Sequence, residues 1–433
     1  MRRLGYLILV MFIGVALIVS SCGGPSNKLV FMYWGTPEEK ATVLSYITNF
    51  LQQNPDVSIE AIHVDSLSFG QKLKTMIAGG TPPDVFYLDI EDFGGLVSRG
   101  ELLQLDDFLN RDRDEVKPED FFEAPFNEFR YKGRLYGIAK DFTTLVLYYN
   151  MDMFKKFGVE FPNDNWTWND FLNAAKKLTK DLDGDGNIDQ YGFVLETWAN
   201  WWRNWVYANG GSFFDEKGNF VLGKEPYLDK NAEAVQFLAD LIWVHKVAPK
   251  ITASRDFGGG EAMFVDGRAA MAAYGRWVTL RFRDITKFKW NVAQMPKGKA
   301  KRASTLFTVA YCAHASTKNP ELAWKLIKFL SSPEIQRDVA NSGLAIPIRK
   351  SVAYSDAFLK ASAIVRNQPQ VDSKVYLDAL NYVTDFRRPT KWVEIRDILD
   401  EYVQKVLNND MKAKEALKEL QLDVEDSIGP TAD

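Results

Sequence analysis

The sequence is poor in the residues that carry most enzyme chemistry. Its 433 residues include only two cysteines, Cys22 and Cys312, and three histidines, His63, His245 and His314. None of these histidines lies in a recognisable zinc, nucleophile or triad motif. A formal net charge of -4 provides no basic excess to neutralise phosphates, which argues against a nucleic-acid partner. These absences favour a binding protein over an enzyme.

Internal repeats and low-complexity blocks are also absent, which argues against a solenoid. The chain opens with Arg2 and Arg3, an apolar run from Leu4 to Val19, and small residues before Cys22. This pattern is typical of a bacterial secretion signal, and the run falls short of the ~20 residues that span a bilayer. We expect residues 1–21 to be removed.

The residues Val19, Ser20, Ser21 and Cys22 resemble a lipobox, at which bacterial lipoproteins are cleaved and lipidated. The resemblance implies lipidation of Cys22, a flexible tether over residues 22–28 and an extracytoplasmic protein anchored to the cell membrane. The alternative is an ordinary cleavage site beside a stray cysteine. With Cys22 lipidated no intrachain disulfide can form, so Cys312 is most simply a small buried hydrophobe.

The rest of the chain is longer than one hydrophobic core usually organises. About 410 residues follow the signal, which predicts two lobes. Aromatic residues make up 13% of the chain and include 12 Trp. Tryptophan is too large to disappear easily into a core, so this excess indicates a further use.

Strands and helices alternate from the start of the folded part. Residues 29–33, 57–64 and 85–88 read as strands, with helices between them. The first helix has Thr36 as its N-cap, Pro37 at its first position and Glu39 three residues past the cap. Further helices are expected after Thr167, over residues 231–247 and from Pro320, and a buried strand over residues 269–273. The pattern predicts an α/β fold with mainly parallel sheets flanked by helices.

Ligands of such folds settle beyond the carboxyl ends of the strands. The candidate binding residues are therefore those that directly follow the predicted strands. They are Trp34 and Thr36, Asp65, Asp89, and Tyr274, Arg276 and Trp277.

Several short motifs, in this order and spacing, carry a family resemblance. They are GGTPPDV at 79–85, LYGIAKD at 135–141, FVDGRAAM at 264–271, GRW at 275–277, KNPELAW at 318–324 and GLAIPIR at 343–349. On these motifs the chain resembles the family 1 extracellular solute-binding proteins of bacterial sugar ABC transporters, the family of maltose-binding protein.

The resemblance implies a two-lobed periplasmic-binding-protein fold of type II, with ligand held in the cleft between the lobes. It places residues 29–139 and 293–345 in the N-terminal lobe, and residues 140–292 and 346–433 in the C-terminal lobe. It further implies a monomer without catalysis or required cofactor, which passes a carbohydrate to membrane permease subunits.

A sugar offers C–H faces and a rim of hydroxyls, so its pocket needs aromatic plates and planar polar groups. The expected plates are Trp34 and Trp277, with Trp198 and Trp201, although a run of Trp at 198, 201, 202 and 205 could also be a packing stripe. The expected hydroxyl partners are Asp65, Asp89, Asp141 and Arg276, each of which could instead cap a helix or form a surface ion pair. Arg349 and Trp392 are added from family-like positions alone.

One motif matches a metal loop. Carboxylates alternate through Asp181, Asp183, Asp185, Asn187 and Asp189, with glycine at the sixth position, as in the first part of an EF-hand. The twelfth position is Gly192 instead of a bidentate Glu, so calcium would need a further carboxylate such as Glu196. A structural calcium ion and a plain Asp/Gly-rich turn both remain open.

Two other functional classes stay open from the sequence alone. Paired carboxylates could serve a secreted carbohydrate-active hydrolase. The same fold could instead bind a peptide, a polyamine or a phosphorylated polyol. A cleft dominated by acidic groups would favour a cation, and clustered Lys and Arg would favour phosphate.

Overall fold

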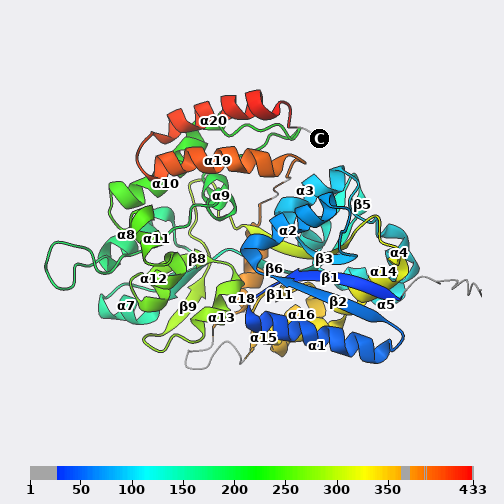
Figure 1. Cartoon of the computed structure of the whole chain (residues 1–433). Coiled ribbons are helices and arrows are strands. Elements are labelled where there is room, and N and C mark those ends of the chain that lie inside the picture. Colours follow the sequence, from blue (N-terminus) through cyan, green and yellow to red (C-terminus); the bar gives the residue numbers. More distant parts are fainter. Residues whose placement is uncertain (1–26, 362–370, 385, 387, 432–433) are drawn as a thin grey trace, which may run out of the picture.

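The computed structural model describes residues 27–361, 371–384, 386 and 388–431. The predicted signal segment and the predicted lipidation site, Cys22, lie outside the described residues. Within these described ranges, no helix is long and apolar enough to span a bilayer. The chain folds into two lobes of strands and helices that lie side by side (Figure 1).

The first lobe is built on a six-stranded sheet of order β11-β6-β10-β3-β1-β2. Strand β1 (Lys28–Trp34) pairs in parallel with β2 (Ser58–Val64) and β3 (Val85–Asp89). Strand β10 (Leu306–Ala313) runs antiparallel to β3 and to β6 (Gly137–Thr144), and β11 (Ile346–Pro347) runs antiparallel to β6. Three of these five pairings are antiparallel, so the predicted mainly parallel sheet is wrong.

The reason lies in how the chain returns to this sheet. Strands β1, β3 and β6 all end at the edge that faces the second lobe, and β10 arrives from that lobe. Because β10 begins beside the carboxyl ends of its neighbours β3 and β6, it must run antiparallel to them. The second sheet, of order β8-β7-β9, is antiparallel throughout: β7 (Val146–Asn150) pairs with β8 (Met271–Tyr274) and β9 (Trp290–Ala293). The α/β class itself is confirmed.

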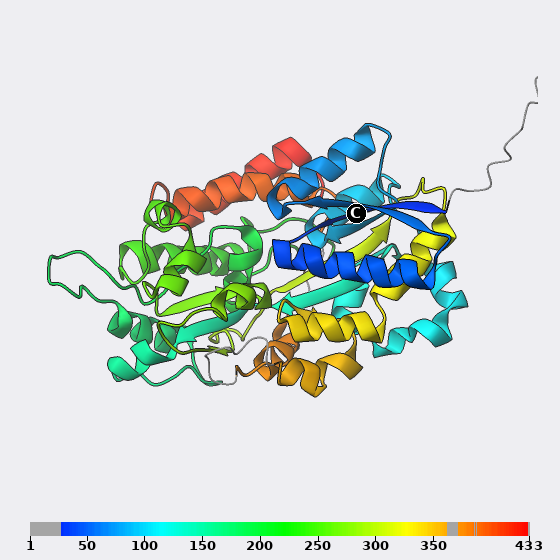
Figure 2. The same cartoon turned by 60° about the horizontal axis from the view of Figure 1, so that its bottom comes forward.

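Helices cover both faces of the first sheet (Figures 1 and 2). Helix α1 begins as predicted, since Thr36 and Glu39 form a capping box and Pro37 takes the first position. The helices of this lobe are α1 (Pro37–Gln53), α2 (Ser66–Ala78), α3 (Ile90–Ser98), α4 (Asp106–Arg111), α5 (Arg113–Val116), α6 (Glu123–Asn127), α14 (Pro320–Leu330), α15 (Pro333–Ser342), α16 (Lys350–Ala353) and α17 (Asp356–Leu359). A small hairpin, β4 (Arg130–Tyr131) and β5 (Arg134–Leu135), completes it.

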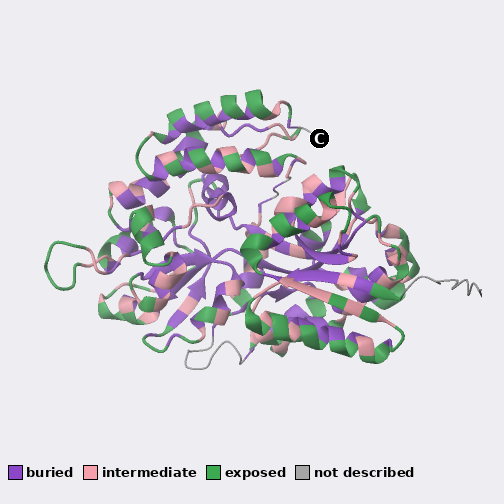
Figure 3. Ribbon diagram, in the orientation of Figure 1, coloured by how far each residue is buried: buried purple, intermediate pink, exposed green. Residues whose placement is uncertain are grey.

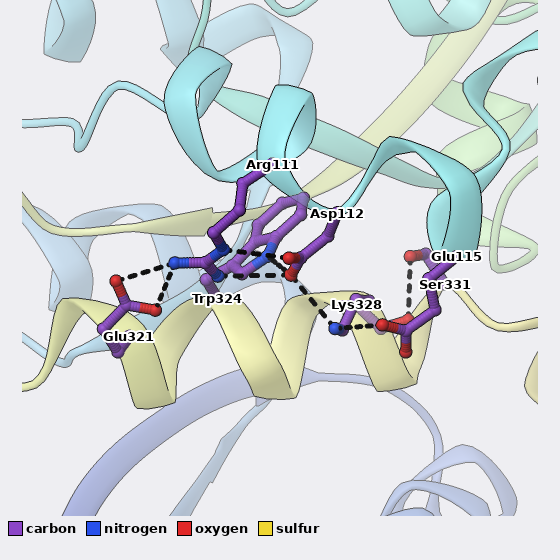
Figure 4. Close-up of polar contacts among 7 residues, drawn as sticks. All are labelled: Arg111, Asp112, Glu115, Glu321, Trp324, Lys328 and Ser331. Atoms are coloured by element: carbon purple, nitrogen blue, oxygen red, sulfur yellow. Dashed lines mark hydrogen bonds and ion pairs between the residues drawn. The ribbon is translucent and has the colours of Figure 1, made fainter.

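A polar cluster fixes α14, which comes from late in the chain, to α4 and α5 (Figure 4). The Asp112 carboxylate accepts hydrogen bonds from Arg111 Nε at 2.9 Å, Trp324 Nε1 at 2.8 Å and Lys328 Nζ at 3.0 Å. Charge-assisted bonds of this kind favour the ionised acid. The hydrogen bond from Arg111 therefore holds the pKa of Asp112 well below its usual range.

Three long helices of the second lobe pack on one another. They are α10, α19 and α20, which lie together in Figure 1, and α19 also contacts α3 of the first lobe. Thr167 caps α8 as predicted, through a capping box with Asp170. The helices are α7 (Met151–Lys156), α8 (Trp168–Leu178), α9 (Ala199–Ala208), α10 (Leu228–Trp243), α11 (Ile251–Asp256), α12 (Gly260–Asp266), α13 (Thr279–Phe282), α19 (Trp392–Leu407) and α20 (Ala413–Ile428).

Within the described residues, three segments cross between the lobes. The first is Leu145, between β6 and β7, and every residue of those strands is buried (Figure 3). The second joins β9 to β10, and the third contains α18 (Lys374–Asp378). The hydroxyls of Tyr148 and Tyr376 lie 2.6 Å apart where these segments meet.

The crossings differ from the expected lobe boundaries. The first lies after Thr144 instead of residue 139, because β6 continues in the first sheet to Thr144. The segment from residue 346, expected in the second lobe, begins in the first, since β11 pairs with β6 and α15 packs against α16 and α17. Where the described residues resume at 371, the chain contacts the second lobe, since Asp372 N donates to Asn291 Oδ1 of β9 at 3.2 Å.

Candidate functional site

A cleft of about 880 Å³ lies between the lobes. Its walls include the carboxyl ends of β1, β3 and β6, where an α/β sheet leaves backbone ends and polar side chains uncovered. The amino end of β10, the start of α9 and one face of α19 complete it. Its volume falls in the range of about 300–1,000 Å³ that is common for small-molecule sites.

The first lobe contributes one aromatic platform to this cleft. The last residue of β1, Trp34, contacts Phe69 with ring centroids 4.6 Å apart and Tyr87 at 5.2 Å, both edge to face. Trp34 and Tyr87 both line the cleft. Contacts with neighbouring rings hold this platform in place.

A second platform comes from the other lobe and the crossing. Trp198 lies 6.4 Å from Trp277, and Phe307 lies 5.4 Å and 5.0 Å from these two rings. Trp198 is the N-cap residue of α9, Trp277 follows β8, and Phe307 is the second residue of β10. All three are partly exposed and line the cleft.

Six of the predicted binding residues line the cleft. They are Trp34, Thr36, Asp89, Asp141, Trp198 and Trp277. A seventh, Tyr274, lines a smaller recess that shares residues with the cleft. The structure thus brings together residues that lie far apart in the sequence, and their contact with a ligand stays a prediction.

Two predicted residues have other roles in the structure. Asp65 is the N-cap of α2, where its carboxylate accepts a hydrogen bond from Ser68 N at 2.9 Å, and it is not among the residues that line the cleft. Trp201 is fully buried and donates from Nε1 to the Ala273 carbonyl at 2.6 Å. It belongs, with Trp202 and Trp205, to the packing stripe that was the alternative.

Three more predicted residues lie in the interior, outside the cleft wall. Arg276 is fully buried, donates to the Ala345 carbonyl at 2.8 Å and lies 4.0 Å over the Phe358 ring. Arg349 donates to the Ser331 carbonyl at 2.8 Å. Trp392 is 1% exposed and donates to Glu91 at 2.6 Å. A position after a strand, or a family-like motif, does not reveal which way a side chain points.

The sequence analysis missed several residues of the cleft wall. They are Glu39, Tyr87, Glu91, Lys140, Asn200, Glu261, Arg281, Phe307, Arg396, Asp397 and Asp400. The alternation of β3 could have indicated Tyr87, which lies two residues before Asp89 on the same face of the strand. Phe307 could not have been found, because its position depends on β10 entering the sheet from the cleft side.

The charges of the cleft wall are mostly engaged with each other. Lys140 forms an ion pair with Asp141, Arg281 lies 3.6 Å from Glu261, and Arg396 lies 3.1 Å from Asp397. Asp89 differs from these. Its burial, together with the negative charge of nearby Glu91, raises its pKa to about 7.

The predicted metal loop lies at the surface of the second lobe. Carboxylate oxygens of Asp181, Asp183 and Asp189 lie within 4.8 Å of one another. Asp185 instead bonds to Asn187, and Glu196 accepts a hydrogen bond from the Tyr274 hydroxyl, so neither is in this group. The loop therefore lacks the extra carboxylate that was expected from Glu196, and calcium binding stays a prediction.

Two lobes joined by crossing segments around a cleft with polar and aromatic walls define the bilobal binding proteins. The model of the family described as bacterial extracellular solute-binding protein matches residues 34–337. The chain belongs to this family.

Individual proteins to which the chain is similar are also binding proteins. A maltotriose-binding protein of Pyrococcus abyssi is 24% identical over 90% of this chain and 83% of its own length. An arabinooligosaccharide-binding protein of Bacillus subtilis is 24% identical over 77% of each chain. Among solved structures, an ABC substrate-binding protein of Listeria monocytogenes in complex with cycloalternan superposes with a TM-score of 0.83 at 26% identity, covering 93% of this chain and 99% of that one.

Proposed function

We propose that this protein is the substrate-binding component of an ABC importer and that its ligand is a sugar or oligosaccharide. The observation that carries the proposal is the pair of aromatic platforms, one around Trp34 and one around Trp198 and Trp277, in a single cleft. Rings on both lobes can stack on the C–H faces of a sugar while carboxylates accept its hydroxyls.

The charges of the cleft favour an uncharged ligand over an anion. Seven carboxylates and three cations line it, and each cation lies next to a carboxylate. A phosphate would find no free basic group among the residues that line the cleft in the described ranges. This argues against the phosphorylated polyol. The excess of acid keeps a polyamine as the competing cargo, so spermidine is included in the test.

Ligand that contacts both lobes stabilises their closed arrangement, because only that arrangement offers both sets of contacts. The closed form is what the protein presents to a membrane permease, while lipidated Cys22 holds it at the outer surface of the cell membrane as a monomer. No catalytic step is needed. Purified protein incubated with oligosaccharides is expected to leave them intact, and turnover would favour the hydrolase.

A thermal-shift screen of mono- and oligosaccharides tests the proposal. A sugar present at about 100 times its Kd is expected to stabilise the protein by about 2.7 kcal/mol. Trp277→Ala is expected to weaken that binding by about tenfold or more, because it removes one stacking surface.

Trp243→Phe is the matched control. Trp243 is also partly exposed, but it lies at the end of α10 and donates to the Leu407 carbonyl at 2.8 Å, outside the cleft. This variant should bind sugar like the unaltered protein. A screen in which spermidine stabilises the protein and no sugar does would reject the sugar assignment.

A further inference from the structure

Arg276 is a buried cation without a counter-ion. Its side chain is fully buried, and no carboxylate of the described residues forms an ion pair with it. Its Nη1 donates to the Ala345 carbonyl at 2.8 Å, whereas its Nε and Nη2 have no hydrogen-bond partner. Burial lowers the pKa of Arg276 to about 10, because the charged form has lost its water. Burying an unpaired cation destabilises a fold, so stability does not account for this residue.

The contacts of Arg276 join the two lobes. It belongs to a turn of residues 275–279 that follows β8 of the second lobe. Its backbone N–H donates to Thr143 Oγ1 of β6, in the first lobe, at 2.7 Å. Ala345, which accepts from its side chain, lies directly before β11 of the first lobe. The backbone and the side chain of one residue thus fix this turn against two separate segments of the other lobe.

Thr279 strengthens the same anchor. Its Oγ1 lies 2.8 Å from the Arg276 carbonyl oxygen and 2.5 Å from the Gly343 carbonyl oxygen, within hydrogen-bond distance of both. Gly343 ends α15 of the first lobe. Both ends of the turn are therefore bonded across the boundary between the lobes.

The ring of Trp277 depends on the position of this turn. A Cβ atom on Gly275 would lie 2.0 Å from Cζ3 and 2.4 Å from Cε3 of the indole, so the ring rests on the backbone of the turn itself. The ring also contacts Phe307, with centroids 5.0 Å apart, and lines the cleft. A shift of the turn would therefore move the ring within the cleft.

We propose that Arg276 is a positioning residue, which holds the Trp277 ring in the cleft by anchoring the 275–279 turn to the first lobe. The inference rests on the proposed function, because it concerns affinity for the sugar that stacks on Trp277. Arg276 is not among the residues that line the cleft, so its effect on binding passes through Trp277. Because the anchor crosses between the lobes, stacking on Trp277 also favours the arrangement of the lobes in which the anchor is formed.

Arg276→Met tests the proposal, because methionine is unbranched and apolar but donates no hydrogen bond. Calorimetric titration with maltotriose, arabino- and galacto-oligosaccharides and cycloalternan measures the affinity. Arg276→Met should weaken binding by about three- to tenfold, and by no more than Trp277→Ala does. In a protein that already carries Trp277→Ala, the same change should have no further effect. A merely structural role would instead weaken binding equally with and without Trp277.

Arg349→Met is the matched control. Arg349 is also buried, lies 4.7 Å over the Phe121 ring and donates to the Ser331 carbonyl at 2.8 Å, but these partners all belong to the first lobe. This change should leave the affinity for sugar unchanged, and melting curves verify the folding of each variant.

Thr279→Val gives a second test that is independent of the buried cation. It removes one link of the same anchor and keeps the shape of the side chain. It should weaken binding when Trp277 is present and have no effect in the Trp277→Ala protein. An equal loss in both proteins, or no loss from either anchor variant, overturns the proposal. If no sugar binds the unaltered protein, the proposed function itself fails.

Discussion

Asp89 combines two tasks at the end of β3. Its carboxylate accepts a hydrogen bond from Glu91 N at 2.9 Å and so caps α3, and it also lines the cleft. A group that caps a helix is usually ionised, yet burial moves the pKa of this one to about 7. The burial of this carboxylate at the cleft wall therefore lowers stability at neutral pH.

The raised pKa of Asp89 predicts a pH dependence of stability. The folded protein holds a proton here up to about pH 7, whereas the unfolded chain loses it near pH 4. Between these values the folded state binds more protons, so this group lowers stability as pH rises. Asp89→Asn, which can still cap α3, should raise the melting temperature at pH 7.5 and leave it unchanged at pH 4. An equal effect at both pH values would contradict this origin.

Residues are also where the sequence was least informative. Trp34, Asp89 and Trp277 were found by their position after strands, and the structure places them in the cleft wall. Arg276 follows a strand equally closely, yet its side chain is buried in the interior against the Phe358 ring. The direction in which a side chain points depends on how distant segments pack around it, and a local sequence pattern gives no information about those segments.

At the scale of elements, local signals were sufficient for several helix starts. Thr36 and Thr167 start helices where capping chemistry predicts, because a cap needs only its own side chain and the next few backbone amides. Pro320 opens α14 at its first position, where the missing N–H costs nothing. The direction in which the strands pair could not be predicted from local sequence. Strand β10 became antiparallel through the path of the chain between lobes, which no property of its own residues reveals.

The surface loop of residues 181–189 gives an element-scale prediction. If its converging carboxylates bind calcium with the weak affinity of extracellular sites, about 1 mM calcium should stabilise the protein by roughly 1 kcal/mol. Asp183→Ala should abolish this stabilisation. Asp356→Ala, which alters an exposed carboxylate paired with Lys360, is the control and should retain it. If calcium does not change the melting temperature of the unaltered protein, the loop is a plain turn without a calcium site.

At the scale of the whole molecule, a buried ion-pair network joins the lobes beside the cleft. Glu91 of α3 accepts hydrogen bonds from Arg388 Nε at 2.7 Å and from Trp392 at 2.6 Å. Arg388 Nη1 also donates to Glu128 at 2.9 Å. The first lobe thus contacts the segment that leads into α19 of the second.

Arg388→Met should cost about 3–5 kcal/mol of stability in chemical denaturation, because it leaves buried carboxylates without their cation. Adding Glu91→Gln should recover part of that loss, by about 1–3 kcal/mol. Lys374→Met, which breaks the exposed pair with Asp378, should have a much smaller effect on stability, because water and salt screen an exposed pair. Strictly additive effects of the first two changes would show that the network does not couple the lobes.

The uneven placement of the tryptophans has an optical consequence. Eight of the twelve are buried, and three of the four partly exposed ones, Trp34, Trp198 and Trp277, border the cleft. Indole emission responds to the water around the ring. The protein therefore carries an intrinsic fluorophore set whose solvent-sensitive members are concentrated where a guest would displace water, so occupancy can be followed without any attached dye.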